Sequence, residues 1–181
     1  LSCSGFKIIA PAMEDNMWKN PATQRNVAAL EADGFVVVAP EAGALGSGRE
    51  GLGRLAEPET ILEHIHRAYA PKALAGLRLA ISAGPTREHL DPARFISNPS
   101  SGKMGFALAQ MAWHLGAEVT LVSGPSTELS PTGVRRINVV STQDMLEALR
   151  AVAPKTDVLV MAAAPADFRP QSSSATKVKK L

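Results

Sequence analysis

A polar turn in the middle of the chain carries the side chains best suited to bind a charged ligand. Asn98, Ser100 and Ser101 bring one amide and two hydroxyls, and Gly102 and Lys103 follow them directly. The first N–H groups of a helix have no partner within it and carry a partial positive charge, which suits phosphate. A lysine there is unfavourable unless an anion compensates it. The turn therefore predicts an anion site, and a capped helix with a solvated lysine is the alternative.

Two better-known phosphate-binding patterns do not fit this turn. A Walker A loop needs a lysine followed by Ser or Thr, whereas Lys103 is followed by Met104. The turn also lacks the glycine spacing of dinucleotide-binding folds. That difference disfavours a generic Rossmann-like oxidoreductase, for which NAD binding would be a cheap test. Gly102 and Gly105 let a ligand approach the backbone closely.

Two segments nearer the C-terminus carry further residues of interest. Ala163 and Ala164 end an apolar run and leave room for a flat ring, and Asp167 offers oxygens to a base or a metal ion. A tight turn with a solvated Asp167 is the alternative. Lys177 and Lys179 fall on one side of an extended segment, where they would neutralise a transferring phosphoryl or nucleotidyl group. Lysine runs are more often simply solvated.

Alternating strands and helices are predicted to position these groups. We expect strands over 6–10, 35–39, 77–82, 118–122, 134–140 and 157–161, helices over 20–32, 58–70, 102–115 and 143–152, and long loops over 40–53 and 84–97. Asn20 is expected to cap the first helix and Ser141 or Thr142 the last. The apolar face of the helix over 102–115 is predicted at Met104, Leu108, Met111, Ala112 and Leu115. The predicted fold class is α/β, a Rossmann-like parallel sheet with flanking helices, preceded by a partial flavodoxin-like segment.

Composition and charge narrow the class of protein. The chain has 181 residues, 45% of them hydrophobic, and a net charge of +2, so neither nucleic acid nor a membrane is an expected partner. Cys3 is the only cysteine, which excludes an internal disulfide and favours a reducing, cytoplasmic location. Both ends look cut, and we expect a piece of a longer protein. A linker over 71–76 is predicted to separate a domain over 1–70 from one over 77–181.

The second part of the chain resembles a known ligase. In order along the chain, the ligase part of the bifunctional phosphopantothenoylcysteine decarboxylase/phosphopantothenate–cysteine ligase family is matched by residues 83–88, 91–92, 94–98, 100–105, 116–117, 119–125, 163–164 and 166–169, with Lys177, Lys179 and Lys180. Asp91 is thus part of one of these motifs. The resemblance implies that CTP activates the carboxylate of 4′-phosphopantothenate as an acyl-cytidylate. The amine of cysteine then attacks it to give an amide and CMP. It also implies Mg²⁺, these small molecules as substrates, and a homo-oligomer.

The resemblance also assigns roles to individual residues. Asn98 would handle the acyl-cytidylate, and Lys177 would contact the nucleotide and favour the first half-reaction, with Lys179 beside it. The residues expected to line the cytidine pocket are Ala163, Ala164 and Asp167, the last also a metal ligand. From the physics of the helix start, the residues expected to border the phosphates are Gly84, Ser100, Ser101, Gly102 and Lys103.

The first seventy residues resemble the flavin-dependent decarboxylase of the same bifunctional family, which implies FMN in the parent protein. The positions that correspond to the family's substrate-binding residues are Met13, Glu14, Met17, Trp18 and Ser47, and the residue type matches at Met13, Met17 and Trp18. Glu14 stands where the family has Asn, and Ser47 stands where it has its active-site Cys. A carboxylate repels an anionic substrate, and a serine lacks the acidity of a thiol. We therefore expect no decarboxylase activity from this chain alone. The alternative for this region is that the full protein retains altered chemistry here. For the chain as a whole, the alternative to the ligase is a degenerate or truncated homologue that serves as a non-catalytic nucleotide-binding or scaffold subunit.

Overall fold

The chain folds as two units, one up to Ala70 and one from Pro71 onward. The computed structural model describes residues 5–179, so Cys3 and Lys180 lie outside the described residues. Within that range no helix combines the length and the apolar character needed to cross a lipid bilayer. The two units are described separately below.

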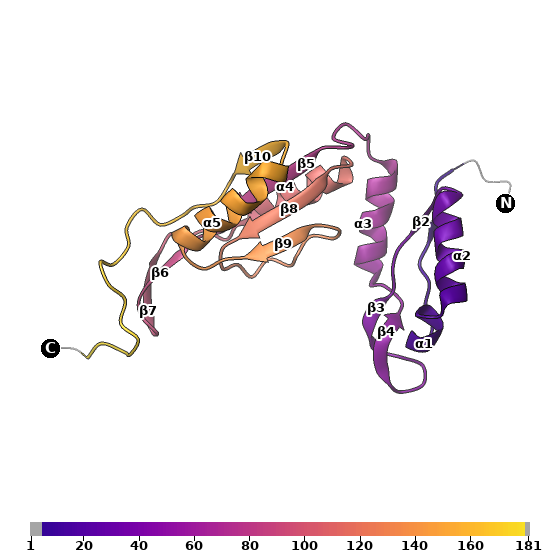
Figure 1. Ribbon diagram of the computed structural model, residues 1–181, viewed down its shortest axis with the longest axis horizontal. Coiled ribbons are helices and arrows are strands. Elements are labelled where there is room, and N and C mark those ends of the chain that lie inside the picture. Colours follow the sequence, from indigo (N-terminus) through magenta and orange to yellow (C-terminus); the bar gives the residue numbers. More distant parts are fainter. Residues whose placement is uncertain (1–4, 180–181) are drawn as a thin grey trace. The chain divides into compact units, whose positions relative to one another are not determined.

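A parallel sheet of four strands forms the centre of the second unit (Figure 1). Its strands are β5 (Arg78–Ala83), β8 (Glu118–Ser123), β9 (Arg135–Asn138) and β10 (Val158–Met161), in the order β10-β5-β8-β9. β5 and β8 occupy the middle of the sheet, and from Leu79 to Ala83 every residue of β5 is buried. Central parallel strands are covered on both faces, which explains their continuous apolar runs. The predicted α/β fold with a parallel sheet is confirmed.

Two helices cover opposite faces of this sheet. Leu121 of β8 packs in the core cluster that includes α4 (Lys103–His114), whereas the next residue, Val122, packs with Met145 and Leu149 of α5 (Thr142–Val152). Successive side chains of a strand point to opposite faces, so α4 and α5 lie on different sides. A short 3₁₀ helix, η1 (Ala153–Lys155), follows α5 and leads into β10.

The buried face of α4 differs from the predicted one. Phe106, Ala109 and Trp113 pack against the sheet, whereas Met104 is 71% exposed and Met111 is 55% exposed. Of the predicted set, Ala112 is buried. The two aromatic residues bury more apolar surface than the methionines would, and the small residues between them let the helix axis approach the sheet. Helical periodicity alone gave the wrong side because α4 is apolar over much of its circumference.

Two segments predicted as loops are antiparallel hairpins. β3 (Glu41–Ala44) pairs with β4 (Glu50–Arg54) in the first unit, and β6 (Arg87–Asp91) pairs with β7 (Arg94–Ser97) in the second. In the second hairpin the Asp91 carboxylate closes the turn, since Oδ1 accepts hydrogen bonds from the backbone N–H groups of Ala93 and Arg94 at 2.8 and 2.9 Å. Glycines and charged residues hide the apolar alternation that normally indicates a strand.

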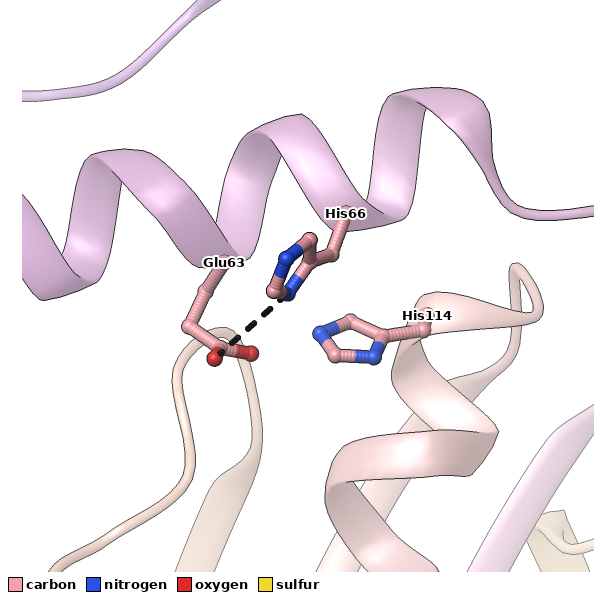
Figure 2. A group of neighbouring side chains, drawn as sticks. All are labelled: Glu63, His66 and His114. Carbon is pink, nitrogen blue, oxygen red and sulfur yellow. Dashed lines mark ion pairs between the residues drawn. The ribbon is translucent and has the colours of Figure 1, made fainter.

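The first unit pairs β1 (Lys7–Ile9) with β2 (Phe35–Val37) in parallel, joined through α1 (Asp15–Trp18) and α2 (Pro21–Ala32). The predicted cap of α2 is confirmed, because Asn20 Oδ1 accepts a hydrogen bond from Ala22 N at 2.9 Å. Its last helix, α3 (Pro58–Tyr69), follows the first hairpin. Figure 2 shows Glu63 and His66 one turn apart on α3, with 3.9 Å between Oε1 and Nδ1.

Candidate functional site

An open cleft of about 860 Å³ lies in the second unit, next to the carboxyl ends of β5, β8 and β9. Ligands of open α/β sheets bind at this edge. The polar residues that line the cleft include Arg87, Asn98, Ser100, Ser101, Arg136 and Asn138. Asn98, Ser100 and Ser101 are thus brought together on one wall, where the turn enters α4.

Gly84 and Gly102 bring the start of α4 against the end of β5. Both are buried and have left-handed φ angles, +75° and +85°. A Cβ atom on Gly102 would lie 3.0 Å from the Cα atom of Gly84. Only glycine tolerates this conformation and this approach without strain. The two predicted phosphate contacts therefore lie behind the residues that line the cleft and hold the turn in place.

Short polar contacts fix the turn before α4. The Ser101 hydroxyl accepts a hydrogen bond from Lys103 N at 3.4 Å, and the Ser126 hydroxyl donates to the Ser101 carbonyl at 2.7 Å. Ser126 also lines the cleft, so this contact ties the turn to the segment that follows β8. The Lys103 side chain is exposed on the first turn of α4. The arrangement presents hydroxyl groups and the positive end of a helix to the cleft.

The Asn98 side chain ties this turn to the segment that follows β10. Asn98 Nδ2 donates hydrogen bonds to the carbonyl oxygens of Pro165 at 2.9 Å and Ala164 at 3.4 Å. Its neighbour Ser97 donates from Oγ to the Thr86 carbonyl at 2.7 Å. An amide held through its nitrogen presents its carbonyl oxygen in a fixed direction. Asn98 is therefore both a cleft-lining group and a link between two parts of the chain.

Asp167 does not line the same cavity as Asn98. It is exposed and lines a second, smaller cavity of about 270 Å³ together with Glu88 and Arg169. Ala163 N donates to Ser82 Oγ at 3.2 Å, and Ala164 N donates to the Gly84 carbonyl at 2.9 Å. These bonds hold the small residues against the end of β5, next to the polar turn.

Lys177 and Lys179 are exposed and line neither of these two cavities. The third lysine of the run, Lys180, lies outside the described residues. The backbone between the two lysines is anchored, since Val178 N donates to Asp91 Oδ2 at 3.2 Å. The lysines are thus carried on a segment fastened to the β6–β7 hairpin.

The polar residues of the cleft that were missed from the sequence include Arg87, Arg136 and Asn138. The Arg136 guanidinium lies over the Phe106 ring, 4.9 Å from its centroid, and Nη1 donates to the Glu128 carbonyl at 3.0 Å. Its Nε is buried and has no hydrogen-bond partner among the described residues. The sequence of β9 could have indicated two of these residues. Arg136 and Asn138 are two positions apart at the carboxyl end of the strand, so they share a face.

In the first unit, Glu14 and Ser47 contact each other directly. The Glu14 carboxylate accepts hydrogen bonds from Ser47 N at 3.0 Å, from Ser47 Oγ at 2.8 Å and from Arg49 Nη2 at 3.0 Å. The Ser47 hydroxyl and the Arg49 guanidinium lower the pKa of Glu14 below its ordinary value. Of the remaining predicted positions, Met13 donates from its backbone N–H to the Gly53 carbonyl at 2.9 Å, Met17 is 57% exposed, and Trp18 ends α1.

The second unit thus defines a class: a Rossmann-like α/β domain with a polar ligand cleft at the carboxyl edge of its sheet. Residues 74–181 match the family described as DNA/pantothenate metabolism flavoprotein C-terminal domain, and residues 2–69 match the family described as Flavoprotein. The chain belongs to the DNA/pantothenate metabolism flavoprotein family.

Curated relatives carry both parts in one polypeptide. The chain is 48% identical over 172 residues to the coenzyme A biosynthesis bifunctional protein CoaBC of Vibrio parahaemolyticus, covering 95% of this chain and 43% of that protein. The CoaBC protein of Mycobacterium tuberculosis is 47% identical over 180 residues, with 96% and 43% covered. The crystal structure of the C-terminal domain of a CoaBC protein is 52% identical, with a TM-score of 0.53 over 55% of this chain and 50% of that one. The chain spans less than half the length of these curated relatives and covers the end of the decarboxylase and the start of the ligase.

Proposed function

We propose that the protein carries the ligase step of coenzyme A biosynthesis, in which CTP drives the joining of cysteine to 4′-phosphopantothenate through an acyl-cytidylate. The observation that carries the proposal is the cleft, where Asn98, Ser100 and Ser101 line one wall at the start of α4. A carboxylate is a poor electrophile. Transfer of the cytidylyl group from CTP to a carboxylate oxygen releases pyrophosphate, and that oxygen then leaves with CMP when the cysteine amine attacks. Such transition states are anionic, so fixed donors and positive partial charges stabilise them.

Each group of the cleft has a role in this proposal. The hydroxyls of Ser100 and Ser101 and the N–H groups at the start of α4 bind phosphate oxygens. Arg87 and Arg136 bring two cations to the same cleft. Asn98 orients the activated carboxylate with its amide, which is already held by the carbonyl oxygens of Ala164 and Pro165. Because these donors are set before the ligand arrives, little reorganisation is needed at the moment of reaction.

The cytidine and metal sites belong to the neighbouring segment. Ala163 and Ala164 would lie against the base, and Asp167 would accept hydrogen bonds from its amino group or hold Mg²⁺. Asp167 and Glu88 line one cavity, and carboxylate oxygens are the ligands that Mg²⁺ prefers. Glu88 Oε1 already accepts a hydrogen bond from Thr142 N at 2.8 Å, so Asp167 is the carboxylate left to hold the ion. A bound Mg²⁺ would neutralise phosphate charge during nucleotidyl transfer. Lys177 and Lys179 would approach the nucleotide from the anchored C-terminal segment.

A second candidate concerns the first unit, which matches the Flavoprotein family and implies FMN in the parent protein. The contact between Glu14, Ser47 and Arg49 favours a folded but catalytically altered unit. There the carboxylate occupies the donors of the hairpin loop that a substrate anion would otherwise engage. We therefore propose that this chain supplies ligase groups and serves the decarboxylase half as a folded platform only.

Asn98→Asp in the protein at its full natural length tests the ligase proposal. The aspartate cannot donate to the Pro165 carbonyl and places a negative charge beside an anionic substrate, so CMP release should fall at least about a hundredfold. The measurement is chromatographic quantification of CMP and of the amide product. Asn26→Asp, the same chemical change on an exposed face of α2, is the matched control and should leave the rate unchanged. Wild-type turnover by Asn98→Asp would rule out the role given to Asn98.

A further inference from the structure

Asp91 is a buried carboxylate that the proposed chemistry does not use. It is 1% exposed and sits at the end of β6, where the second hairpin turns. Oδ2 accepts hydrogen bonds from Arg94 Nε at 3.0 Å and from Arg94 Nη2 at 2.6 Å. The Arg94 guanidinium and the backbone N–H groups of the turn hold the pKa of Asp91 well below its ordinary value. The carboxylate therefore stays charged throughout the physiological range.

The Asp91–Arg94 ion pair also holds both polar backbone groups of Val178. Val178 N donates to Asp91 Oδ2 at 3.2 Å, and the Val178 carbonyl accepts from Arg94 Nη2 at 3.2 Å. A second attachment lies four residues earlier, where Ser174 N donates to the Leu90 carbonyl at 2.9 Å. The hairpin turn thus clasps a segment more than eighty residues further along the chain.

We propose that Asp91 is a positioning residue that, through Arg94 and Val178, fixes the segment 174–179 and so sets where Lys177 and Lys179 stand. This inference rests on the proposed function, in which Lys177 and Lys179 contact the nucleotide. No helix or strand is formed over 174–179, so the hairpin contacts are the attachments that define the path of this segment. Charge-assisted hydrogen bonds are about twice as strong as neutral ones, which suits a two-point anchor.

We call the contacts of Asp91 and Arg94 with Val178 the clamp. Trypsin cleavage of the 181-residue chain tests it. Asp91→Asn keeps the shape of the side chain and the turn but removes the ion pair, so cleavage after Lys177 should become roughly five- to tenfold faster. Asp157→Asn is the matched control, since Asp157 makes the same kind of ion pair with Arg78, the first residue of β5, at 3.0 Å. The control should leave cleavage after Lys177 unchanged. Mass spectrometry of the released C-terminal peptide gives the rate.

A second measurement tests whether Asp91 positions the lysines for CTP or only orders the segment 174–179. In the protein at its full natural length, Asp91→Asn should raise KM for CTP severalfold and leave KM for 4′-phosphopantothenate unchanged, and Asp157→Asn should change neither. Arg94→Lys retains the positive charge and one donor nitrogen. Its trypsin cleavage rate and its KM for CTP should therefore lie between those of wild type and Asp91→Asn. Equal trypsin rates for wild type and Asp91→Asn overturn the clamp, and faster cleavage with an unchanged KM for CTP overturns its positioning role. The trypsin result judges the clamp even if the wild-type protein makes no acyl-cytidylate, an outcome that would count against the proposed function alone.

Discussion

The Glu14 carboxylate accepts three hydrogen bonds from the loop between β3 and β4, two from Ser47 and one from Arg49. Glu14 and Ser47, taken singly, are each a departure from the decarboxylase pattern. Together they form one interaction, since the carboxylate needs donors and the serine supplies both its hydroxyl and its N–H group. The structure therefore explains the two departures as a matched pair, a relation that residue types taken singly do not reveal.

The ion pair between Asp157 and Arg78 predicts how the free energy of unfolding depends on pH. Hydrogen bonds from the Arg78 side chain and backbone lower the pKa of Asp157 from 3.8 to about 2. A lowered folded-state pKa contributes stability that is present above the unfolded value and lost as the pH falls through the folded value. The difference in unfolding free energy between wild type and Asp157→Asn should therefore shrink as the pH falls from about 4 to about 2. Urea titrations at several pH values measure it, and a difference that stays constant over that interval would contradict the ion pair.

At the scale of elements, the turn into α4 depends on two glycines that no other residue replaces cheaply. Gly102 combines a φ of +85° with a close approach to Gly84, whereas Gly76 has a φ of +80° and open space around its missing Cβ. Gly76→Ala should cost about 1 kcal/mol of stability, the strain of the left-handed backbone alone. Gly102→Ala should cost about 2 to 4 kcal/mol, because crowding against β5 adds to that strain.

Thermal unfolding of the two glycine variants measures this difference. Equal losses at positions 76 and 102 would show that α4 does not press on the end of β5. The comparison matters for the cleft because the same contact places Ser100 and Ser101 at its wall.

The elements also show where sequence reasoning succeeds and where it stops. β5, β8 and β10 were predicted because they are largely apolar runs, and Ser141 proved to be the cap of α5, in a reciprocal pair with Asp144. The hairpin at Arg87–Asp91 was missed because its strand residues are mostly charged. The buried face of α4 was misplaced because periodicity does not weigh Phe106 and Trp113 against methionines.

The candidate site was predicted in part for a similar reason. Asn98, Ser100 and Ser101 are neighbours in sequence, so their common position in the cleft follows from one turn. Arg87 comes from the β6–β7 hairpin and Arg136 from β9 of the parallel sheet, and only the folded arrangement brings them to the same cleft. Asp91 was seen as part of a motif, but its contact with Val178 joins residues 87 positions apart, which no local pattern encodes.

At the scale of the whole molecule, the chain joins a small flavoprotein-like unit to a larger unit with the cleft. The core of the second unit is built from its own residues, with Ile81 and Leu121 fully buried on the α4 side and Val122 on the α5 side. The homo-oligomer and the cytoplasmic location stay predictions. The cleft lies wholly within the second unit, so nucleotide binding can be tested on the chain as it stands.

Calorimetric titration of CTP with Mg²⁺ into Ser101→Asp tests the central claim, that the start of α4 holds nucleotide phosphates. An aspartate beside a helix N-terminus is favourable for the helix, so stability should not fall, but its charge repels phosphate. We predict that wild type binds CTP more tightly than ATP and that Ser101→Asp weakens CTP binding at least about tenfold. Ala107→Asp, which adds the same charge to an exposed position of α4, should bind CTP like wild type. Undiminished CTP binding by Ser101→Asp would contradict the account.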